Sequence, residues 1–261
     1  MKYACKFYQG CPMLQTTDEI IIKYNKKDLE IFDFVQKWKQ EQRIILNITE
    51  LEDDLEKCLE IFTATAKLHN IAVMCSKKQN YSLLAEECIP FFFIEKCGTF
   101  DELVGQLRLK VSDVYVVNEL GFYLPEVAAL CKDKNVNVRA IPNVAQSSSE
   151  IAGDDFSKFF IRPDDVRLYE EYVDIFEFGG DRLDIQNTLY QIYKEEKWEG
   201  NLAMVITGLS ENIPNDSILP LFGETRLKCK KKCCFGKCEI CKTIKSISKK
   251  LDEKEIHFAK E

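Results

Sequence analysis

Between about residues 18 and 197, short apolar runs alternate with longer stretches that have helical periodicity. Most runs are apolar at consecutive positions, as expected for strands that are buried on both faces of a parallel sheet. The pattern therefore predicts a repeated strand–helix unit. The eight runs predicted as strands are Glu19–Lys23, Arg43–Ile48, Ile71–Cys75, Phe91–Glu95, Asp113–Val117, Asn137–Ile141, Lys158–Arg162 and Asp174–Phe178.

The intervening stretches predict helices with one apolar face. Thr99 is a suitable N-cap for one of them, and Pro125 and Pro163 stand where a first helical turn tolerates proline. Eight strands alternating with helices favour an α/β fold, a compact (β/α)8 TIM-like barrel, over a doubly wound open sheet, because no Gly-x-Gly-x-x-Gly follows the first strand. The predicted helices are Asp28–Trp38, Leu51–Leu68, Asp101–Leu109, Leu124–Lys132, Asp164–Tyr172 and Asp184–Lys197.

The composition divides the chain into three parts. Residues 1–207 are predicted to form the barrel. Residues 208–225 are rich in Pro, Asn, Asp and Ser and predict a linker loop. Residues 226–261 form a basic, cysteine-rich tail that ends in a predicted helix, and this tail is expected to bind a metal.

The charge is unevenly distributed between these parts. The whole chain has a net charge of −7, yet residues 226–250 hold Arg226 and nine lysines against Glu239 alone, a net +9. The rest of the chain must then carry −16 (−7 − 9). This arrangement predicts that residues 226–250 contact nucleic acid or an acidic protein surface, the alternative being a solvated tail that aids solubility.

Five of the 12 cysteines lie between positions 229 and 241, whereas the other seven are scattered. Thiolates bind soft or borderline metals, and four of them can close a tetrahedral site. We expect zinc, with an iron–sulfur cluster as the alternative, because clusters also use closely spaced cysteines. The predicted ligands are Cys229, Cys233, Cys238 and Cys241, and Cys234 can replace Cys233.

A second candidate site follows from the barrel itself, because active sites of this fold lie at the C-terminal ends of the strands. Glu119 and Glu177 are candidates for acid and base there, and Lys23 and Arg162 for holding an anion. The alternative is that these polar residues merely end buried strands. The predicted pocket comprises Asn118, Glu119, Asn143, Gln146, Arg162 and Glu177.

Three segments also resemble those of a known family. Val116-Val117-Asn118-Glu119-Leu120-Gly121 is followed by Asn143-Val144-Ala145-Gln146-Ser147, and later by Asp174-Ile175-Phe176-Glu177-Phe178-Gly179-Gly180-Asp181-Arg182. Over residues 110–190 this resembles the collagenase-like peptidase family, whose relatives include proteins of anaerobic ubiquinone and RNA hydroxylation. The resemblance implies roles for Glu119, Gly121, Gln146, Glu177 and Arg182. The family's cysteine signature has a different spacing, and the small barrel with a compact tail is also similar to uncharacterised tailed-phage proteins.

Two functions from different classes remain open. The first is a metal-binding barrel protein whose tail contacts a partner, and the second is an enzyme of the collagenase-like type, either a peptidase or an iron–sulfur hydroxylation protein, that acts at the barrel mouth. With only two histidines, His69 and His257, the sequence predicts neither a nucleophile triad nor a histidine-ligated catalytic zinc. No apolar run is long enough for a membrane helix or a signal peptide, so a cytoplasmic protein without membrane contact is expected.

Overall fold

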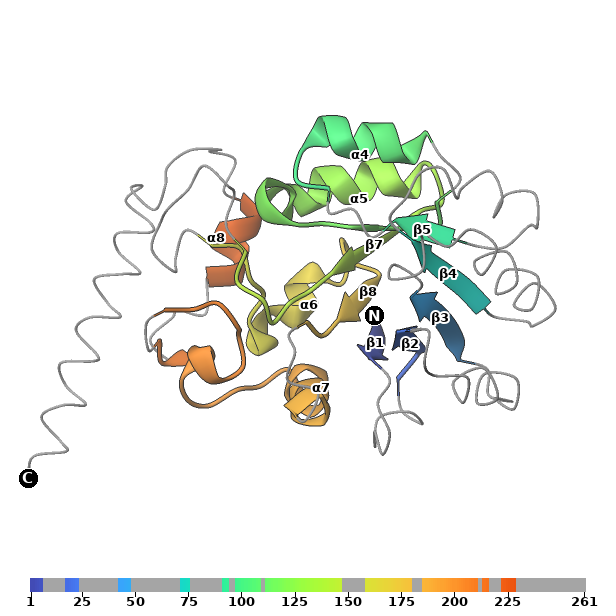
Figure 1. Cartoon of the computed structure of the whole chain (residues 1–261). Helices are drawn as coiled ribbons and strands as arrows, with labels where there is room; N and C mark the ends of the chain where they lie inside the picture. Colours follow the sequence, from blue (N-terminus) through green and yellow to red (C-terminus); the bar gives the residue numbers. More distant parts are fainter. Residues whose placement is uncertain are drawn as a thin grey trace, which may run out of the picture.

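Eight parallel strands form one continuous sheet in the order β5-β4-β3-β2-β1-β8-β7-β6 (Figure 1). The strands are β1 (Lys2–Lys6), β2 (Glu19–Lys23), β3 (Arg43–Asn47), β4 (Ile71–Cys75), β5 (Phe91–Phe93), β6 (Asp113–Tyr115), β7 (Asn137–Ala140) and β8 (Ile175–Glu177). A computed structural model describes residues 1–6, 17–23, 42–47, 71–75, 91–93, 97–108, 111–146, 158–179, 185–210, 213–215 and 222–228.

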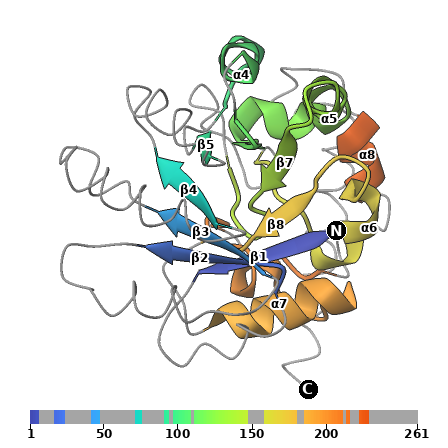
Figure 2. The same ribbon diagram turned by 90° about the vertical axis from the view of Figure 1, so that its right-hand side faces the viewer.

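The sheet curls until its two outer strands meet (Figure 2). Cys97, just after β5, forms a parallel bridge with Val116, just after β6. The Cys97 amide donates to the Tyr115 carbonyl at 3.2 Å, and the Val117 amide donates to the Cys97 carbonyl at 3.4 Å. These bonds close the sheet, so the predicted TIM-like barrel is confirmed and the open sheet is not found.

Side chains alternate between the inside and the outside of the barrel along each strand, as the period of two requires. One buried cluster consists of strand residues and therefore lies inside the barrel; its members are Ala4, Ile21, Ile45, Ala72, Met74, Tyr115 and Ile175. The neighbouring positions belong to a larger cluster that includes helix residues such as Leu103, Val127 and Leu189. That larger cluster is the core between the strands and the helices.

The described helices lie outside the strands (Figure 2). Thr99 caps α4 (Phe100–Leu107) with a complete capping box, in which Glu102 is its partner. Pro125 stands in the first turn of α5 (Leu124–Lys132), as predicted. The others are α6 (Val166–Tyr169), α7 (Gln186–Glu195), α8 (Phe222–Lys228) and the 3-10 helices η3 (Asn118–Tyr123), η5 (Pro163–Asp165) and η7 (Leu202–Met204).

One predicted strand is wrong, and the first strand of the barrel was missed. Lys158–Arg162 lies outside the sheet, where Phe159 forms only an isolated antiparallel bridge with Gln146. Its apolar residues are buried in the outer core instead, with Phe160 stacked on Phe222 at 5.5 Å between ring centroids. The missed strand is β1, Lys2–Lys6. It has a lysine at each end and the small residues Ala4 and Cys5 between them, so it does not form a long apolar run.

The segment after residue 200 packs against this outer core. Ile213 and Phe222 are each 2% exposed, and Asn215 is 3% exposed. The end of the segment predicted as a linker therefore already belongs to α8, which is packed on the barrel. The predicted helices Asp28–Trp38 and Leu51–Leu68, and the tail from Cys229 onward, lie outside the described residues.

Candidate functional site

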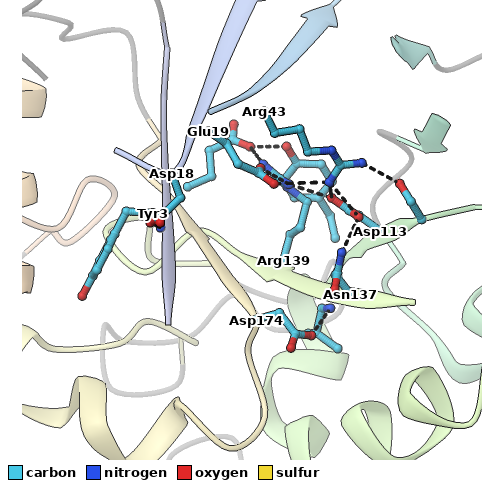
Figure 3. Close-up of polar contacts among 12 residues, drawn as sticks. Tyr3, Asp18, Glu19, Arg43, Asp113, Asn137, Arg139 and Asp174 are labelled. Atoms are coloured by element: carbon cyan, nitrogen blue, oxygen red, sulfur yellow. Dashed lines mark hydrogen bonds and ion pairs between the residues drawn. The ribbon is translucent and has the colours of Figure 1, made fainter. Parts of the chain in front are cut away.

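Charged side chains occupy the inside of the barrel near the N-terminal ends of its strands. Glu19 begins β2, Arg43 begins β3 and Asp113 begins β6, while Arg139 comes from the middle of β7. Figure 3 shows these four side chains converging, whereas Tyr3 points away from them. The fold thus brings together four charges that are far apart in the sequence.

Arg139 is the centre of this cluster. Its Nη1 lies 2.7 Å from Glu19 Oε2 and 2.7 Å from Asp113 Oδ2, and its side chain is 0% exposed. Arg43 Nη1 joins the same two carboxylates, at 3.2 Å from Glu19 Oε1 and 3.1 Å from Asp113 Oδ2. Asn137 adds a hydrogen bond of 2.9 Å to Asp113 Oδ1. Two guanidinium groups and two carboxylates therefore pair inside the barrel.

The surrounding charges favour the ionised forms of Asp113 and Arg139. Burial alone would raise the pKa of Asp113, but Arg139 and Arg43 outweigh it, so the pKa lies below its usual value. Burial opposes the charge of Arg139, yet Tyr115, Glu19, Glu177 and Asp113, in that order, hold its pKa well above the usual value. Both shifts favour the charged forms of Asp113 and Arg139, so the contact between them is an ion pair.

Glu177 contacts the same Arg139 from the C-terminal end of β8. It is the last residue of β8, is 6% exposed and faces the inside of the barrel, as Ile175 does two residues earlier. The Tyr115 hydroxyl donates a hydrogen bond to Glu177 Oε2, and Arg139 Nη2 lies 3.6 Å from the same oxygen. The carboxylate is thus held at the C-terminal end of β8 by groups that project from β6 and β7.

Tyr115 and Arg139 form a support beneath Glu177. The Arg139 guanidinium lies 5.5 Å from the centroid of the Tyr115 ring, in a cation–π contact. Burial, followed by the charge of Glu177, raises the pKa of Tyr115 well above its usual value, so its hydroxyl keeps its proton. Tyr115 can therefore only donate to Glu177 in this arrangement.

The described residues of the predicted pocket make different contacts. Asn143 is 1% exposed, and its amide bonds both backbone groups of Gly179, accepting from the nitrogen at 2.8 Å and donating to the oxygen at 3.0 Å. Asn143 therefore clamps the end of β8 to the end of β7. Gln146 pairs through its backbone with Phe159, at 2.8 and 2.7 Å.

The remaining candidates lie in two other places. Asn118 and Glu119 begin η3, directly beyond β6, but their side chains are outside the described part of the structure. Gly121 is in the same helix, where an added Cβ would lie 2.4 Å from Phe159. Arg182 is also outside the described residues.

Arg162 belongs to a second buried cluster rather than to the contacts of Glu177. Its Nε donates to Asn215 Oδ1 at 2.8 Å, and its Nη1 lies 3.8 Å from Asp165 Oδ2. Burial, opposed by Arg162 and reinforced by Asp164, raises the pKa of Asp165 to about 6. This cluster fastens the segment around residue 215 to η5.

The predicted metal ligands Cys229, Cys233, Cys238 and Cys241 lie outside the described residues, so the metal site stays a prediction. Among the described residues, no group of three or more His, Cys, Asp or Glu side chains is placed to hold a metal ion. Within the same residues, no helix is long and apolar enough to cross a membrane.

Sequence reasoning missed the centre of the site. Glu19, Asp113 and Arg139 were read only as parts of apolar runs, although Arg139 interrupts the run Asn137–Ile141. A charged residue inside a strand buried on both faces needs a counter-charge, and that requirement was the available signal. Only the closed barrel shows that Glu19 and Asp113 supply it.

Comparisons with known proteins bear on the fold. No protein-family model matches the chain, and no curated protein matches it. Among solved structures, it is similar to tryptophan synthase from M. tuberculosis in its aminoacrylate- and BRD0059-bound form, at 11% identity over 79% of this chain and 93% of that chain, with a TM-score of 0.50. The tryptophan synthase complex from Pyrococcus furiosus matches at 13% identity over 75% and 96%, with a TM-score of 0.49.

At these identities the similarity shows the fold alone, which is that of an α/β barrel of the TIM type. The resemblance to the collagenase-like peptidase family, and the similarity to tailed-phage proteins, stay predictions.

Proposed function

We propose that this protein is an enzyme that transfers protons to or from a small molecule at the C-terminal end of its barrel, with Glu177 as the acid–base group. The observation that carries the proposal is the place of this carboxylate. It ends β8, faces the barrel interior and is 6% exposed. In this fold, the C-terminal ends of the strands carry the catalytic groups.

The charge count supports a functional reading of Glu177. Arg43 and Arg139 carry two positive charges, and Glu19 and Asp113 balance them with two negative charges. Glu177 brings a third carboxylate, so these five described groups together have a net charge of −1 (2 − 3) when all are ionised. A buried carboxylate that is not needed for neutralisation costs stability, and such costs are typical of functional sites.

The geometry leaves one oxygen of Glu177 for a substrate. Tyr115 and Arg139 both contact Oε2. Oε1 makes no hydrogen bond within the described part of the chain. A carboxylate that is oriented through one oxygen and open at the other can accept a proton from a bound molecule and return it.

The experiment uses purified protein and a mixture of small metabolites in D2O. Mass spectrometry should detect a metabolite that is consumed, or that gains deuterium, with the wild type but not with Glu177→Gln. Glu195→Gln is the matched control, because Glu195 is exposed on α7. Equal behaviour of the wild type and Glu177→Gln, or no change in any metabolite with the wild type, would refute the proposal.

The alternative enzyme is of the collagenase-like type, either a peptidase or an iron–sulfur hydroxylation protein. Its site would lie at the same mouth and would add Glu119 and Gln146 to Glu177. Glu119 begins η3 directly beyond β6, which supports such a shared location. Iron and sulfide in the anaerobically purified protein favour the hydroxylation type.

The second candidate function is metal binding by the basic tail, with contact to a partner such as nucleic acid. It is supported by five cysteines within 13 residues (229–241) and by the net charge of +9 over residues 226–250. Zinc would be held by Cys229, Cys233, Cys238 and Cys241, with an iron–sulfur cluster as the alternative. This function is compatible with catalysis in the barrel, because the two sites use different residues.

Metal analysis tests this second function. The wild type should contain about one zinc per chain for a four-thiolate site, and Cys238→Ser should lose most of it. If the lysines bind nucleic acid, the affinity should fall steeply as the salt concentration rises. Equal metal content in both proteins would contradict the metal site.

A further inference from the structure

Two lysines stand at the C-terminal ends of neighbouring strands on the side of the sheet that faces the barrel interior. Lys6 follows the interior residue Ala4 by two positions, and Lys23 follows the interior residue Ile21 in the same way. Because side chains alternate along a strand, both lysines project toward the inner side of the barrel mouth. Asn47 ends β3 on the same side and is the register partner of Lys23.

The strand register places Lys6 on the strand next to Glu177, and Lys23 one strand farther away. In β8, Glu177 is paired with Ala4 of β1, so Lys6 lies two residues farther toward the mouth on the adjacent strand. In turn, Lys6 is paired with Ile21 of β2, so Lys23 lies two residues farther again. Glu177 on β8, Lys6 on β1 and Lys23 on β2 therefore lie on three neighbouring strands, each two residues closer to the mouth than the one before.

Lys6 is held in place and is available for a ligand. Its backbone amide donates to Gln186 Oε1 at 3.2 Å, and Gln186 is 1% exposed at the start of α7, so the end of β1 is fixed. The Lys6 side chain is half-buried, and its ammonium makes no ion pair or hydrogen bond within the described part of the chain. A half-buried ammonium of this kind is suited to an anion.

Arg162, which the sequence placed with Lys23 as an anion-binding group, does not serve in this way. It contacts Asn215, Asp164 and Asp165 in the second cluster. Lys6 takes its place beside Lys23. Together the two lysines bring two positive charges to the side of the mouth next to Glu177, and a concave, low-dielectric site concentrates the field of the charges that line it.

We infer that Lys6 and Lys23 bind the oxyanion of a small substrate, a phosphate or a carboxylate, whose reacting part lies against Glu177. This inference rests on the proposed function and names the substrate class for the same site. The anion would bind at β1 and β2, and the proton would move at the end of β8. A substrate that reaches from β2 to β8 could thus be held by its anion at one end while its reacting atom lies next to Glu177 at the other.

The test is isothermal titration with inorganic phosphate and, separately, with malonate, at constant ionic strength. The wild type should bind at least one of the two probes, and the preferred probe identifies the anion. Lys6→Gln and Lys23→Gln should each weaken that binding about tenfold, as expected for the loss of one charge-assisted hydrogen bond. Lys132→Gln, on the exposed side of α5, should bind as the wild type does.

Glu177→Gln separates this inference from the proposed function, because it should bind the anion at least as tightly as the wild type while losing turnover. If Lys6→Gln does not fold, Lys23→Gln decides the test, since the Lys23 side chain is exposed. The inference is overturned if the wild type binds neither probe, or if the folded lysine variants bind as tightly as the wild type. Either result leaves the turnover comparison for Glu177 unaffected.

Discussion

Replacing Arg139 by methionine should destabilise the barrel strongly. Methionine keeps the length of the side chain but removes the guanidinium that contacts Glu19 and Asp113 at 2.7 Å each. Among the described residues, Arg43 would then be the one guanidinium left for both carboxylates; it lies 3.2 and 3.1 Å from them and is itself 23% exposed. The loss of one partner leaves an uncompensated charge in the interior.

The expected loss is about 3–5 kcal/mol in the free energy of unfolding, the range for breaking a buried ion pair from one side. This is a large part of the roughly 5–15 kcal/mol that stabilises a typical domain. It corresponds to a fall of roughly 6–20 °C in Tm at about 2–4 °C per kcal/mol. The control is Arg167→Met, because the Arg167 side chain is 79% exposed and pairs with Glu196 at the surface. That variant should lose less than about 1 kcal/mol.

The pH dependence provides a second, independent check. In the wild type the pKa of Asp113 is lowered, so its contribution to stability is present above the unfolded pKa of about 4 and is lost as the pH falls through the folded pKa. Without Arg139, burial should dominate and raise that pKa, so protonation would relieve the penalty as the pH falls. The stability difference between wild type and Arg139→Met should therefore shrink between pH 7 and pH 5.

Urea unfolding followed by circular dichroism measures both quantities. A loss of less than about 1 kcal/mol at pH 7 would show that the ion pairs of Arg139 contribute no more than exposed ones do. A loss that is equal at pH 7 and pH 5 would show that the buried carboxylates are not its cause.

Three further predictions concern other parts of the chain. Gly179→Ala should cost about 1–3 kcal/mol, because the new Cβ would lie 2.5 Å from Ile141 Cγ2, whereas Gly105→Ala, with nothing within 4 Å, should stabilise α4 slightly; thermal unfolding compares them. Burial raises the folded pKa of Asp165 to about 6, so the wild type should lose up to about 2–3 kcal/mol of stability as the pH rises from the unfolded pKa of about 4 through 6. Asp165→Asn should not show this loss, and urea unfolding at several pH values measures the difference. Cys238→Ser should make residues 226–250 sensitive to limited proteolysis while the barrel stays intact, and equal resistance would contradict a metal-stabilised tail.

Much of the barrel could be predicted from the sequence, because a strand buried on both faces leaves a run of consecutive apolar residues. Seven of the runs do correspond to strands of the sheet. Lys158–Arg162 has the same pattern but is buried between η3 and α8 without sheet pairing, and burial alone leaves the same signature. Lys2–Lys6 is a strand that the apolar pattern does not indicate, because lysines stand at both of its ends; it nevertheless pairs with both β2 and β8.

The site was predictable only in part. Glu177 could be found from its position at the C-terminal end of a strand, because catalytic groups of this fold lie at such positions. The roles of Tyr115 and Arg139 could not, because they depend on which strands become neighbours when the sheet closes. The prediction for Arg162 rests on Lys158–Arg162 being a barrel strand, whereas this segment lies outside the sheet and Arg162 contacts Asp165. Asn143 was found, but its amide serves the backbone of Gly179.

The most direct test of the central claim is the initial rate of Glu177→Gln relative to the wild type, measured on the metabolite that the wild type consumes or deuterates. We expect the rate to fall about 10²-fold or more with an unchanged circular dichroism spectrum, because general acid–base catalysis contributes roughly 10²–10⁴-fold. Glu195→Gln should retain the wild-type rate. A folded Glu177→Gln protein with a rate within about twofold of the wild type would contradict the assignment of Glu177 as the acid–base group.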